Sequence, residues 1–300
     1  MTSESQSIRT LAVIGAGQMG AQIAIQAALH DVDVRLHDVV AGHAAEAIAA
    51  NRTHLERRVE KGKLTADARD RALARLRPCD ALDDACAGVD LVIEAVVEDL
   101  DVKRAVFAEL DRLTPASAIL ATNSSYIGSS ELVDAAPAHA GRVLNLHFFY
   151  PPLVMRLVEV VRNPSTDDAV VAASIAFVRA IDRVPVVLRK EVPGFLVNRI
   201  LRAITNEAYD LLEQGVASFA DIDQACELGL NHPLGPFRLS DLSGLDIGYR
   251  NRQARHAATG DPADRPPAAL ARRVERGDLG RKTGRGFYDY ATRPPRPTED

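Results

Sequence analysis

TLAVIGAGQMGAQIAIQAAL, residues 10–29, identifies the architecture of the N-terminal half of the chain. Thr10 to Ile14 predicts a short apolar strand, which continues into a glycine loop and then into an alanine-rich helix. Strand, glycine loop and helix in this order are the context in which a G-x-G-x-x-G pattern indicates dinucleotide binding. Gly15 permits the tight turn, Gly17 lets the backbone approach a pyrophosphate, and Gly20 lets the helix pack closely on the strand. The alternative is an ordinary turn with structural glycines, but the complete pattern favours a dinucleotide site.

The start of this helix and the end of the next strand predict further cofactor contacts. The helix opens at Gln18 and Met19, where we expect free N–H groups to face the phosphates. A second strand, residues 32–37, ends at Asp38, and an acid at this spacing binds the ribose diol in NAD-type sites. No basic residue follows Asp38 immediately, and Arg35 lies earlier in the strand. The pattern therefore favours NAD over NADP.

The next segment predicts a pair of helices that is longer than a simple crossover. Residues 43–59 are predicted to form the first helix. The second opens at Thr65, whose hydroxyl suits an N-cap, and stops at Pro78. We expect the pair to project from the edge of the sheet. Lys61 lies in the turn between the two helices, where it is either a solvated surface residue or a ligand for phosphate.

Two further apolar strands end in polar tips. The strand at residues 88–98 ends at Glu98, and Lys103 lies in the helix that follows it. The strand that begins at Ala118 is followed by the polar residues Asn123 and Ser124. Ligands bind at the carboxyl ends of the strands in parallel sheets, so we expect these tips to line the same edge as the glycine loop.

A histidine and a glutamate lie on two apolar runs that a double proline separates. The run 143–146 ends at His147, and the run that begins at Leu153 carries Glu159, with Pro151 starting the turn between them. Two adjacent strands would bring the carboxylate within reach of the imidazole. An imidazole whose tautomer is fixed by an acid is suited to proton transfer near neutral pH. The alternative is a partly buried histidine with an unrelated surface glutamate.

The character of the chain changes after a Pro-Gly hinge at residues 190–195, which divides it into domains 1–190 and 191–300. The second domain is predicted to be all-helical, with a long amphipathic helix over 196–213 and further helices at 218 onward, 237–246 and 268–276. Asn198 is either a polar residue at a helix start or a ligand to what lies between the domains. A basic, glycine-rich loop contains Lys282, and a disordered Pro-rich tail is expected to end the chain. Broad apolar helix faces favour a homodimer through this half.

Composition excludes several classes of protein. The 300 residues carry 36 basic and 41 acidic side chains, a net charge of −5, which gives no general attraction for nucleic acid or anionic membranes. Three cysteines lack metal-ligand spacing and indicate free thiols of a reducing compartment. No stretch has the length of a membrane span or a signal region, so we expect a soluble, cytoplasmic protein with no metal.

Several motifs together resemble the L-3-hydroxyacyl-CoA dehydrogenase family, in particular its short bacterial 3-hydroxybutyryl-CoA members. The matching segments are GAGQMGAQIA, VIEAVVEDLDVK, TNSS, LHFFYPPLVMRLVEVV, PGFLVNR, HPLGPF followed by GLD, and GRKTGRGFYDY, in the order of the family from residue 11 to 290. The resemblance implies NAD-dependent oxidation of an L-3-hydroxyacyl-CoA to the 3-oxoacyl-CoA, or the reverse reaction.

The resemblance also implies individual roles. His147 would be the general base and acid with Glu159 as its partner, and Ser124 and Asn198 would hydrogen-bond the substrate oxygens. Asp38, Glu98, Lys103, Ser124 and Lys282 would contact the cofactor, and Lys61 would contact a CoA phosphate. The chain departs from the family at two positions. A CoA-contacting serine of the family would fall near His54, and Tyr150 stands where the family usually has an asparagine beside the nicotinamide and substrate.

These departures leave alternatives open. Tyr150 can reshape the acyl pocket, so the substrate can also be a hydroxyacyl group on a carrier protein, or a hydroxy-dicarboxylyl-CoA. An alternative of another class is a non-catalytic protein that retains the NAD fold. The joint presence of His147, Glu159, Ser124 and Asn198 argues against it.

Overall fold

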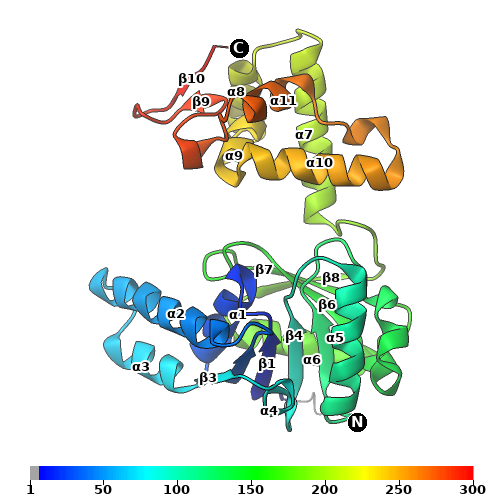
Figure 1. The fold of residues 1–300 in the computed structure, drawn as a ribbon. Helices are drawn as coiled ribbons and strands as arrows, with labels where there is room; N and C mark the ends of the chain where they lie inside the picture. Colours follow the sequence, from blue (N-terminus) through cyan, green and yellow to red (C-terminus); the bar gives the residue numbers. More distant parts are fainter. Residues whose placement is uncertain (1–6, 300) are drawn as a thin grey trace. The chain divides into compact units, whose positions relative to one another are not determined.

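The computed structural model describes residues 7–299, which form two compact units divided between Leu196 and Val197 (Figure 1). The division lies slightly beyond the predicted one, after Lys190. The backbone N–H of Leu196 donates a hydrogen bond to Oε1 of Glu159 at 3.1 Å, and this contact ties the hinge segment to the first unit. Each unit is described by itself.

The first unit contains a sheet of eight strands in the order β3-β2-β1-β4-β5-β6-β7-β8. The strands are β1 Thr10–Ile14, β2 Asp33–His37, β3 Leu76–Cys79, β4 Leu91–Glu94, β5 Ile119–Thr122, β6 Val143–Phe148, β7 Leu157–Arg162 and β8 Val184–Leu188. β1 to β6 pair in parallel, β7 is antiparallel to β6, and β8 is parallel to β7. The strand order reverses between β1 and β4, which is the topological switch point where doubly wound sheets bind their ligands.

Helices cover both faces of this sheet (Figure 1). They are α1 Gln18–Ala28, α2 His43–Glu60, α3 Ala66–Ala74, α4 Leu82–Cys86, α5 Leu100–Leu113 and α6 Asp168–Ala180, with short 3-10 turns η1 Ser129–Glu131, η2 Val133–Ala135 and η3 Pro137–Arg142. Successive strand residues point to opposite faces. Leu11 and Val13 belong to one core with α1 and α6, whereas Ala12 and Ile14 belong to a second core with Phe107 of α5. This confirms the predicted doubly wound α/β architecture.

Two strands of the first unit differ from the predictions. The strand β3 was not predicted, because Pro78 lies in its middle; as the outermost strand of the sheet it can tolerate a residue without an N–H group. The predicted strand 88–98 is much shorter, and only Leu91–Glu94 belongs to the sheet. The chain turns away after Glu94, whose own carboxylate accepts the backbone N–H of Val96 at 2.7 Å.

The strand that carries Glu159 begins later than predicted. After Pro151 the chain makes a further turn, in which the carbonyl of Pro151 accepts the N–H groups of Val154 and Met155, each at 2.9 Å. β7 therefore starts at Leu157 rather than near Leu153. Glu159 still lies inside the strand, as predicted.

The second unit is mainly helical and encloses an aromatic core. Its elements are α7 Val197–Glu213, α8 Phe219–Gly229, α9 Pro236–Ser243, α10 Leu245–Thr259, η4 Pro262–Asp264, α11 Ala268–Glu275, η5 Arg281–Thr283, β9 Tyr288–Asp289 and β10 Arg296–Pro297. Phe219, Phe237 and Phe287 are buried together at its centre. Across residues 7–299, the helices are too short or too polar to cross a membrane.

Two predictions for this unit are wrong. The helix predicted over 237–246 ends at Ser243, because Gly244 adopts a φ of 96°, and α10, which was not predicted, begins directly after it. The tail is not disordered over its described part, since β10 pairs antiparallel with β9. The second unit is therefore mainly helical with a small two-stranded sheet, rather than all-helical.

Candidate active site

The register of the parallel strands brings their carboxyl ends to one edge. Ile14 of β1 pairs with Glu94 of β4, Glu94 pairs with Thr122 of β5, and Thr122 pairs with Asn145 of β6. The residues that follow these positions therefore emerge side by side. They include the glycine loop, the tip after β5 and His147, so the predicted common edge is confirmed.

In the glycine loop a side chain would find open space at Gly17, but would clash at Gly15 and Gly20. Gly15 has a φ of 104°, and a Cβ there would lie 2.6 Å from the carbonyl oxygen of Ala95. A Cβ on Gly20 would lie 1.9 Å from the carbonyl oxygen of Gly15. A Cβ on Gly17 would meet no atom within 4 Å. The loop is thus closed where helix and strand meet and open at Gly17, as a backbone that approaches a pyrophosphate requires.

The first turn of α1 lies at this open position. α1 begins at Gln18, and its N-cap residue, Gly17, has no side chain with which to accept the N–H groups of the first turn. The side chain of Gln18 is exposed, whereas that of Met19 packs partly against the core. The free N–H groups of this first turn suit a bound phosphate.

Asp38 is held beside the glycine loop. Its carboxylate accepts the N–H of Ala16 at 2.7 Å and that of Val40 at 3.0 Å, and it lies 3.2 Å from Nδ1 of His43. Burial acts to raise the pKa of Asp38, but the two N–H donors and His43 outweigh burial and lower it. The guanidinium of Arg35 is directed to backbone carbonyls, including that of Asp84 at 3.3 Å. The acid at the ribose position is therefore ionised, and Arg35 is engaged elsewhere, which suits NAD.

His147 and Glu159 form a buried pair. They lie directly opposite each other in the antiparallel pairing of β6 with β7, and Nδ1 of His147 lies 2.7 Å from Oε2 of Glu159. The side chain of Glu159 is fully buried, and His147 is 3% exposed. Rings of Phe149 and Phe195 pack against the imidazole, with centroids 4.5 Å and 5.5 Å away. The predicted imidazole–carboxylate pair is present in the first unit.

The other nitrogen of the imidazole contacts Ser125, which the sequence analysis did not single out. Nε2 of His147 lies 3.0 Å from the hydroxyl oxygen of Ser125. The carboxylate of Glu159 can only accept a hydrogen bond, so Nδ1 carries the proton of the neutral imidazole. Nε2 therefore has a lone pair, which accepts a hydrogen bond from the Ser125 hydroxyl. A basic nitrogen with a hydroxyl already in contact is suited to remove a proton from an alcohol.

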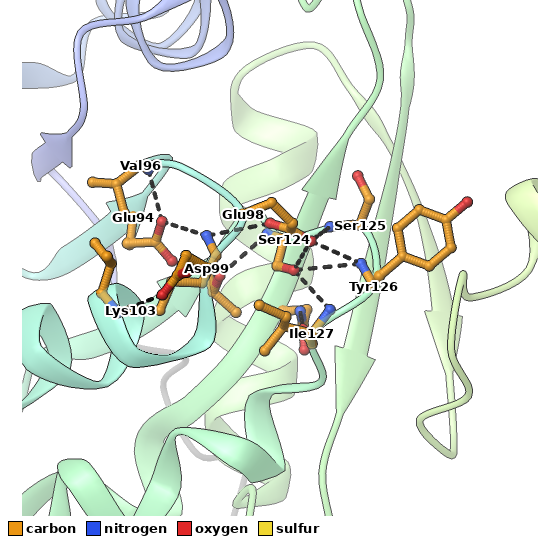
Figure 2. A network of polar contacts seen from close by, with 12 residues as sticks. Glu94, Val96, Glu98, Asp99, Lys103, Ser124, Ser125, Tyr126 and Ile127 are labelled. Atoms are coloured by element: carbon orange, nitrogen blue, oxygen red, sulfur yellow. Dashed lines mark hydrogen bonds and ion pairs between the residues drawn. The ribbon is translucent and has the colours of Figure 1, made fainter. Parts of the chain in front are cut away.

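Ser124 lies at the predicted edge, and its hydroxyl contacts Glu98. Its hydroxyl donates to Glu98 and accepts the N–H of Ile127 at 2.8 Å (Figure 2). Glu98 also accepts the N–H groups of Ser125 and Tyr126, each at 3.1 Å. Burial acts to raise the pKa of Glu98, but the hydrogen bond from Ser124 and the charge of Lys103 outweigh it and lower the pKa. Ser124 and Glu98 therefore fix the loop that presents Ser125.

Lys103 is buried behind this loop. Its ammonium lies 2.7 Å from Oε1 of Glu94 and 3.4 Å from Oε2 of Glu98 (Figure 2). Lys103 is 1% exposed, and Glu94 is fully buried. Thr122 donates a further hydrogen bond to Glu94 at 2.7 Å. Removing one member of such a buried ion pair typically costs about 3–5 kcal/mol, so Lys103 holds Glu98 and the strand tip in place.

A pocket of about 500 Å³ lies between the glycine loop and α2. Gln18, His43 and His54 contribute to its lining. Burial, followed by the charges of Arg58, Arg57 and Lys61, lowers the pKa of His54. Lys61 is exposed at the end of α2. The lining also includes the acidic Glu46 but not Lys61, so a contact of Lys61 with a phosphate stays a prediction.

The remaining predicted residues lie in other surroundings. Tyr150 follows β6 and is 59% exposed. Asn198 lies in the first turn of α7 and is half-buried, and Nζ of Lys282 lies 2.5 Å from Oδ1 of Asp246. Asn198 and Lys282 belong to the second unit, so their contacts with the residues of the first unit stay predictions.

Both halves of the chain match models of one protein family. Residues 10–192 match the NAD binding domain of 3-hydroxyacyl-CoA dehydrogenase, and residues 194–290 match its C-terminal domain. A 3-hydroxybutyryl-CoA dehydrogenase of Bradyrhizobium diazoefficiens is 42% identical over 291 residues, which cover 97% of this chain and 98% of that protein. A 3-hydroxybutyryl-CoA dehydrogenase of Mycobacterium tuberculosis is 43% identical over 292 residues, covering 95% of this chain and all of that protein (100%).

A solved structure agrees with these sequence matches. The crystal structure of (S)-3-hydroxybutyryl-CoA dehydrogenase from Ralstonia eutropha superposes with a TM-score of 0.85 at 37% identity, and the match covers 95% of this chain and 100% of that one. The family models, the full-length relatives and the site geometry agree. The chain therefore belongs to the 3-hydroxyacyl-CoA dehydrogenase family and is an NAD-dependent oxidoreductase.

Proposed function

We propose that the chain is a 3-hydroxybutyryl-CoA dehydrogenase, which interconverts L-3-hydroxybutyryl-CoA and acetoacetyl-CoA with NAD. The observation that carries this proposal is the imidazole of His147, held by Glu159 at 2.7 Å and in contact with Ser125 at 3.0 Å, at the ligand-binding edge of the sheet. The names of the full-length relatives support the short acyl group. Such a reaction would belong to fatty acid metabolism.

The residues at the sheet edge fit a bound dinucleotide. The open position at Gly17, the first turn of α1 and the ionised Asp38 match a pyrophosphate and a ribose diol. When bound, NAD supplies the nicotinamide ring that accepts the hydride from C3 of the substrate. We infer that Glu98 contacts the cofactor, that Lys103 acts by positioning Glu98, and that Lys282 contacts the cofactor from the second unit.

The proton transfer is assigned to residues of this chain. In the oxidising direction Nε2 of His147 accepts the proton of the C3 hydroxyl, and Glu159 stabilises the imidazolium that forms. In the reducing direction His147 returns the proton to the same oxygen. General base catalysis of this kind contributes about 10²–10⁴-fold to the rate.

The substrate oxygens require donors near the imidazole. Ser125 fits this role because its hydroxyl already lies 3.0 Å from Nε2 of His147. Ser124 was expected there, but its hydroxyl is engaged with Glu98. Asn198 is proposed as the second donor, and Lys61 as a ligand for a CoA phosphate.

Tyr150 and His54 are the residues that favour a second class of substrate. Tyr150 is 59% exposed after β6, and His54 lines the pocket beside α2. A phenol and an imidazole at these positions would suit an acyl group on a carrier protein or a hydroxy-dicarboxylyl-CoA. Turnover with an acyl-carrier-protein thioester that exceeds turnover with acetoacetyl-CoA would favour this alternative.

The experiment that tests the proposal is NADH oxidation with a series of 3-oxoacyl-CoA chain lengths. We expect the highest kcat/KM with acetoacetyl-CoA and lower values as the chain lengthens. A maximum at a long or a dicarboxylic acyl group would overturn the choice of substrate. NADH binding without turnover on any thioester would instead support the non-catalytic alternative.

We infer a homodimer in the cytoplasm. Val216, Leu228 and Leu230 of the second unit are 63%, 77% and 64% exposed, and apolar side chains at this density favour an interface between copies. All three cysteines are free, which suits a reducing compartment. Sedimentation that gives a monomer at micromolar concentration would contradict the dimer.

A further inference from the structure

A second pocket is built entirely from residues of the C-terminal unit. It has a volume of about 580 Å³, and its walls come from α9, the turn η5 and the segment that joins β9 to β10. Figure 1 shows α9 beside the strands β9 and β10. Pockets that hold small molecules measure roughly 300–1,000 Å³, so this one is large enough for a compact metabolite.

The pocket carries an excess of positive charge. Arg238, Arg281 and Arg293 all line it. Glu227 lies 3.8 Å from Nη1 of Arg238, but within residues 7–299 neither Arg281 nor Arg293 has a carboxylate partner. Nε of Arg238 is buried and has no hydrogen-bond partner in the described part of the chain. The described lining therefore has three guanidinium groups and no carboxylate, and two of these groups, on Arg281 and Arg293, are exposed.

The rest of the lining is apolar or aromatic. Leu234, Leu242 and Pro295 contribute aliphatic surface. The ring of Tyr290 is held in the wall because its hydroxyl donates to Oδ2 of Asp241 at 3.2 Å. A ligand that uses both parts of the lining must combine an anionic group with an apolar body.

We propose that this pocket binds a phosphate monoester with a compact apolar or aromatic body. A phosphate monoester carries about −1.5 to −2 charges at pH 7 and three acceptor oxygens, whereas a carboxylate carries a single charge. Guanidinium groups match the geometry of phosphate through paired hydrogen bonds. Three of them around one cavity favour the more highly charged ligand. Its lining shares no residue with the set assigned to hydride and proton transfer.

The test is a calorimetric titration of the full-length protein with three matched probes. The protein is first saturated with NAD⁺ and acetoacetyl-CoA, which are both oxidised and cannot react, so that the proposed active site is filled. Phenyl phosphate, benzoate and inorganic phosphate are then titrated separately. We expect phenyl phosphate to bind at least about tenfold more tightly than either other probe, because only it combines a phosphate group with a ring.

Variants assign the binding to this pocket. Arg281→Gln and Arg293→Gln should each weaken phenyl phosphate binding by about tenfold or more, because each removes a charged donor. Thr292→Glu adds a negative charge to the wall, which repels the phosphate, and should abolish phenyl phosphate binding. Arg285→Gln is the matched control, because Arg285 lies outside the lining and 3.7 Å from Asp278.

Several outcomes would overturn the proposal. They are an absence of phenyl phosphate binding, equal or tighter binding of benzoate or inorganic phosphate, and an equal loss in Arg285→Gln. Phenyl phosphate binding that is unchanged in both Arg281→Gln and Arg293→Gln would also overturn the proposal. These results are independent of turnover, so failure of the proposed dehydrogenase activity would leave the test of this pocket intact.

Discussion

Glu159 lies directly opposite His147 across the antiparallel strands β6 and β7, with Oε2 2.7 Å from Nδ1 of the imidazole. Its other carboxylate oxygen accepts the N–H of Leu196 at 3.1 Å. The fully buried carboxylate is thus held from two sides. The imidazole therefore presents its second nitrogen, Nε2, in a fixed orientation toward Ser125.

Replacing Glu159 tests the role of this carboxylate. Glu159→Gln should lower kcat by at least about a hundredfold, because an amide neither fixes the required tautomer nor stabilises an imidazolium. The pH profile of kcat should also shift. Glu159→Asp keeps the charge and should recover part of the rate. An unchanged pH profile in Glu159→Gln would leave this residue with a structural role alone.

The two serines after β5 should differ in their effects. Ser125→Ala removes the hydroxyl that contacts His147, and it should lower kcat about tenfold while NADH affinity stays the same. Ser124→Ala removes the hydroxyl that donates to Glu98, so it should chiefly lower stability and weaken NADH binding. Steady-state kinetics with NADH titrations of both variants separate these effects. The reverse pattern would assign the catalytic contact to Ser124.

Two glycine substitutions in the loop after β1 should separate binding from folding. Gly17→Ala places a methyl group in open space, so the free energy of unfolding should change by less than about 0.5 kcal/mol. NADH binding should nevertheless weaken at least about tenfold, because the methyl group occupies the approach of the pyrophosphate.

Gly20→Ala is the comparison, because its Cβ would lie 1.9 Å from the carbonyl oxygen of Gly15. Overpacking of this kind typically costs about 1–3 kcal/mol of stability. Urea unfolding and NADH fluorescence titrations measure both quantities. Normal NADH affinity in Gly17→Ala would contradict the assignment of the loop.

The lowered pKa of Glu98 predicts a dependence of stability on pH. In the native state this carboxyl ionises below its ordinary value of 4.5, so the native state binds fewer protons there than the unfolded state. Its contribution to stability is complete above that value and is lost as the pH falls through the lowered pKa. The difference in unfolding free energy between wild type and Glu98→Gln should therefore shrink between about pH 5 and pH 3.

Urea unfolding at several pH values measures this dependence. Glu60→Gln, which removes a carboxylate at an exposed position at the end of α2, is the matched control. A Glu98→Gln difference that stays constant over the same range would contradict the network in Figure 2.

Local patterns predicted the fold well where short-range signals determine it. The strand at Thr10–Ile14 was predicted correctly, because apolar runs and glycines act within a few residues. Thr65 caps α3 as expected and accepts the N–H of Ala68 at 3.1 Å. The β3 strand and the α10 helix were missed, because a proline or glycine that usually ends an element is tolerated at a sheet edge or between two helices.

The candidate site depends on contacts between segments far apart in the sequence, and the sequence pattern does not identify every residue that makes them. The turn after Pro151 shifted the start of β7, yet the antiparallel pairing still brought Glu159 to His147. Beyond β5 the chain leaves the sheet, so periodicity no longer says which of two adjacent serines faces the imidazole. Glu98 accepts hydrogen bonds from the hydroxyl of Ser124 and the N–H of Ser125, and these bonds orient the loop so that the Ser125 hydroxyl faces the imidazole.

The turnover of His147→Gln, measured together with its NADH affinity in the same preparation, tests the proton-transfer assignment most directly. The amide can fill the buried space but cannot accept the proton of the substrate hydroxyl. We expect NADH to bind with unchanged affinity while kcat on acetoacetyl-CoA falls by at least about 10²–10⁴-fold. Turnover close to that of the wild type would show that another group carries the proton.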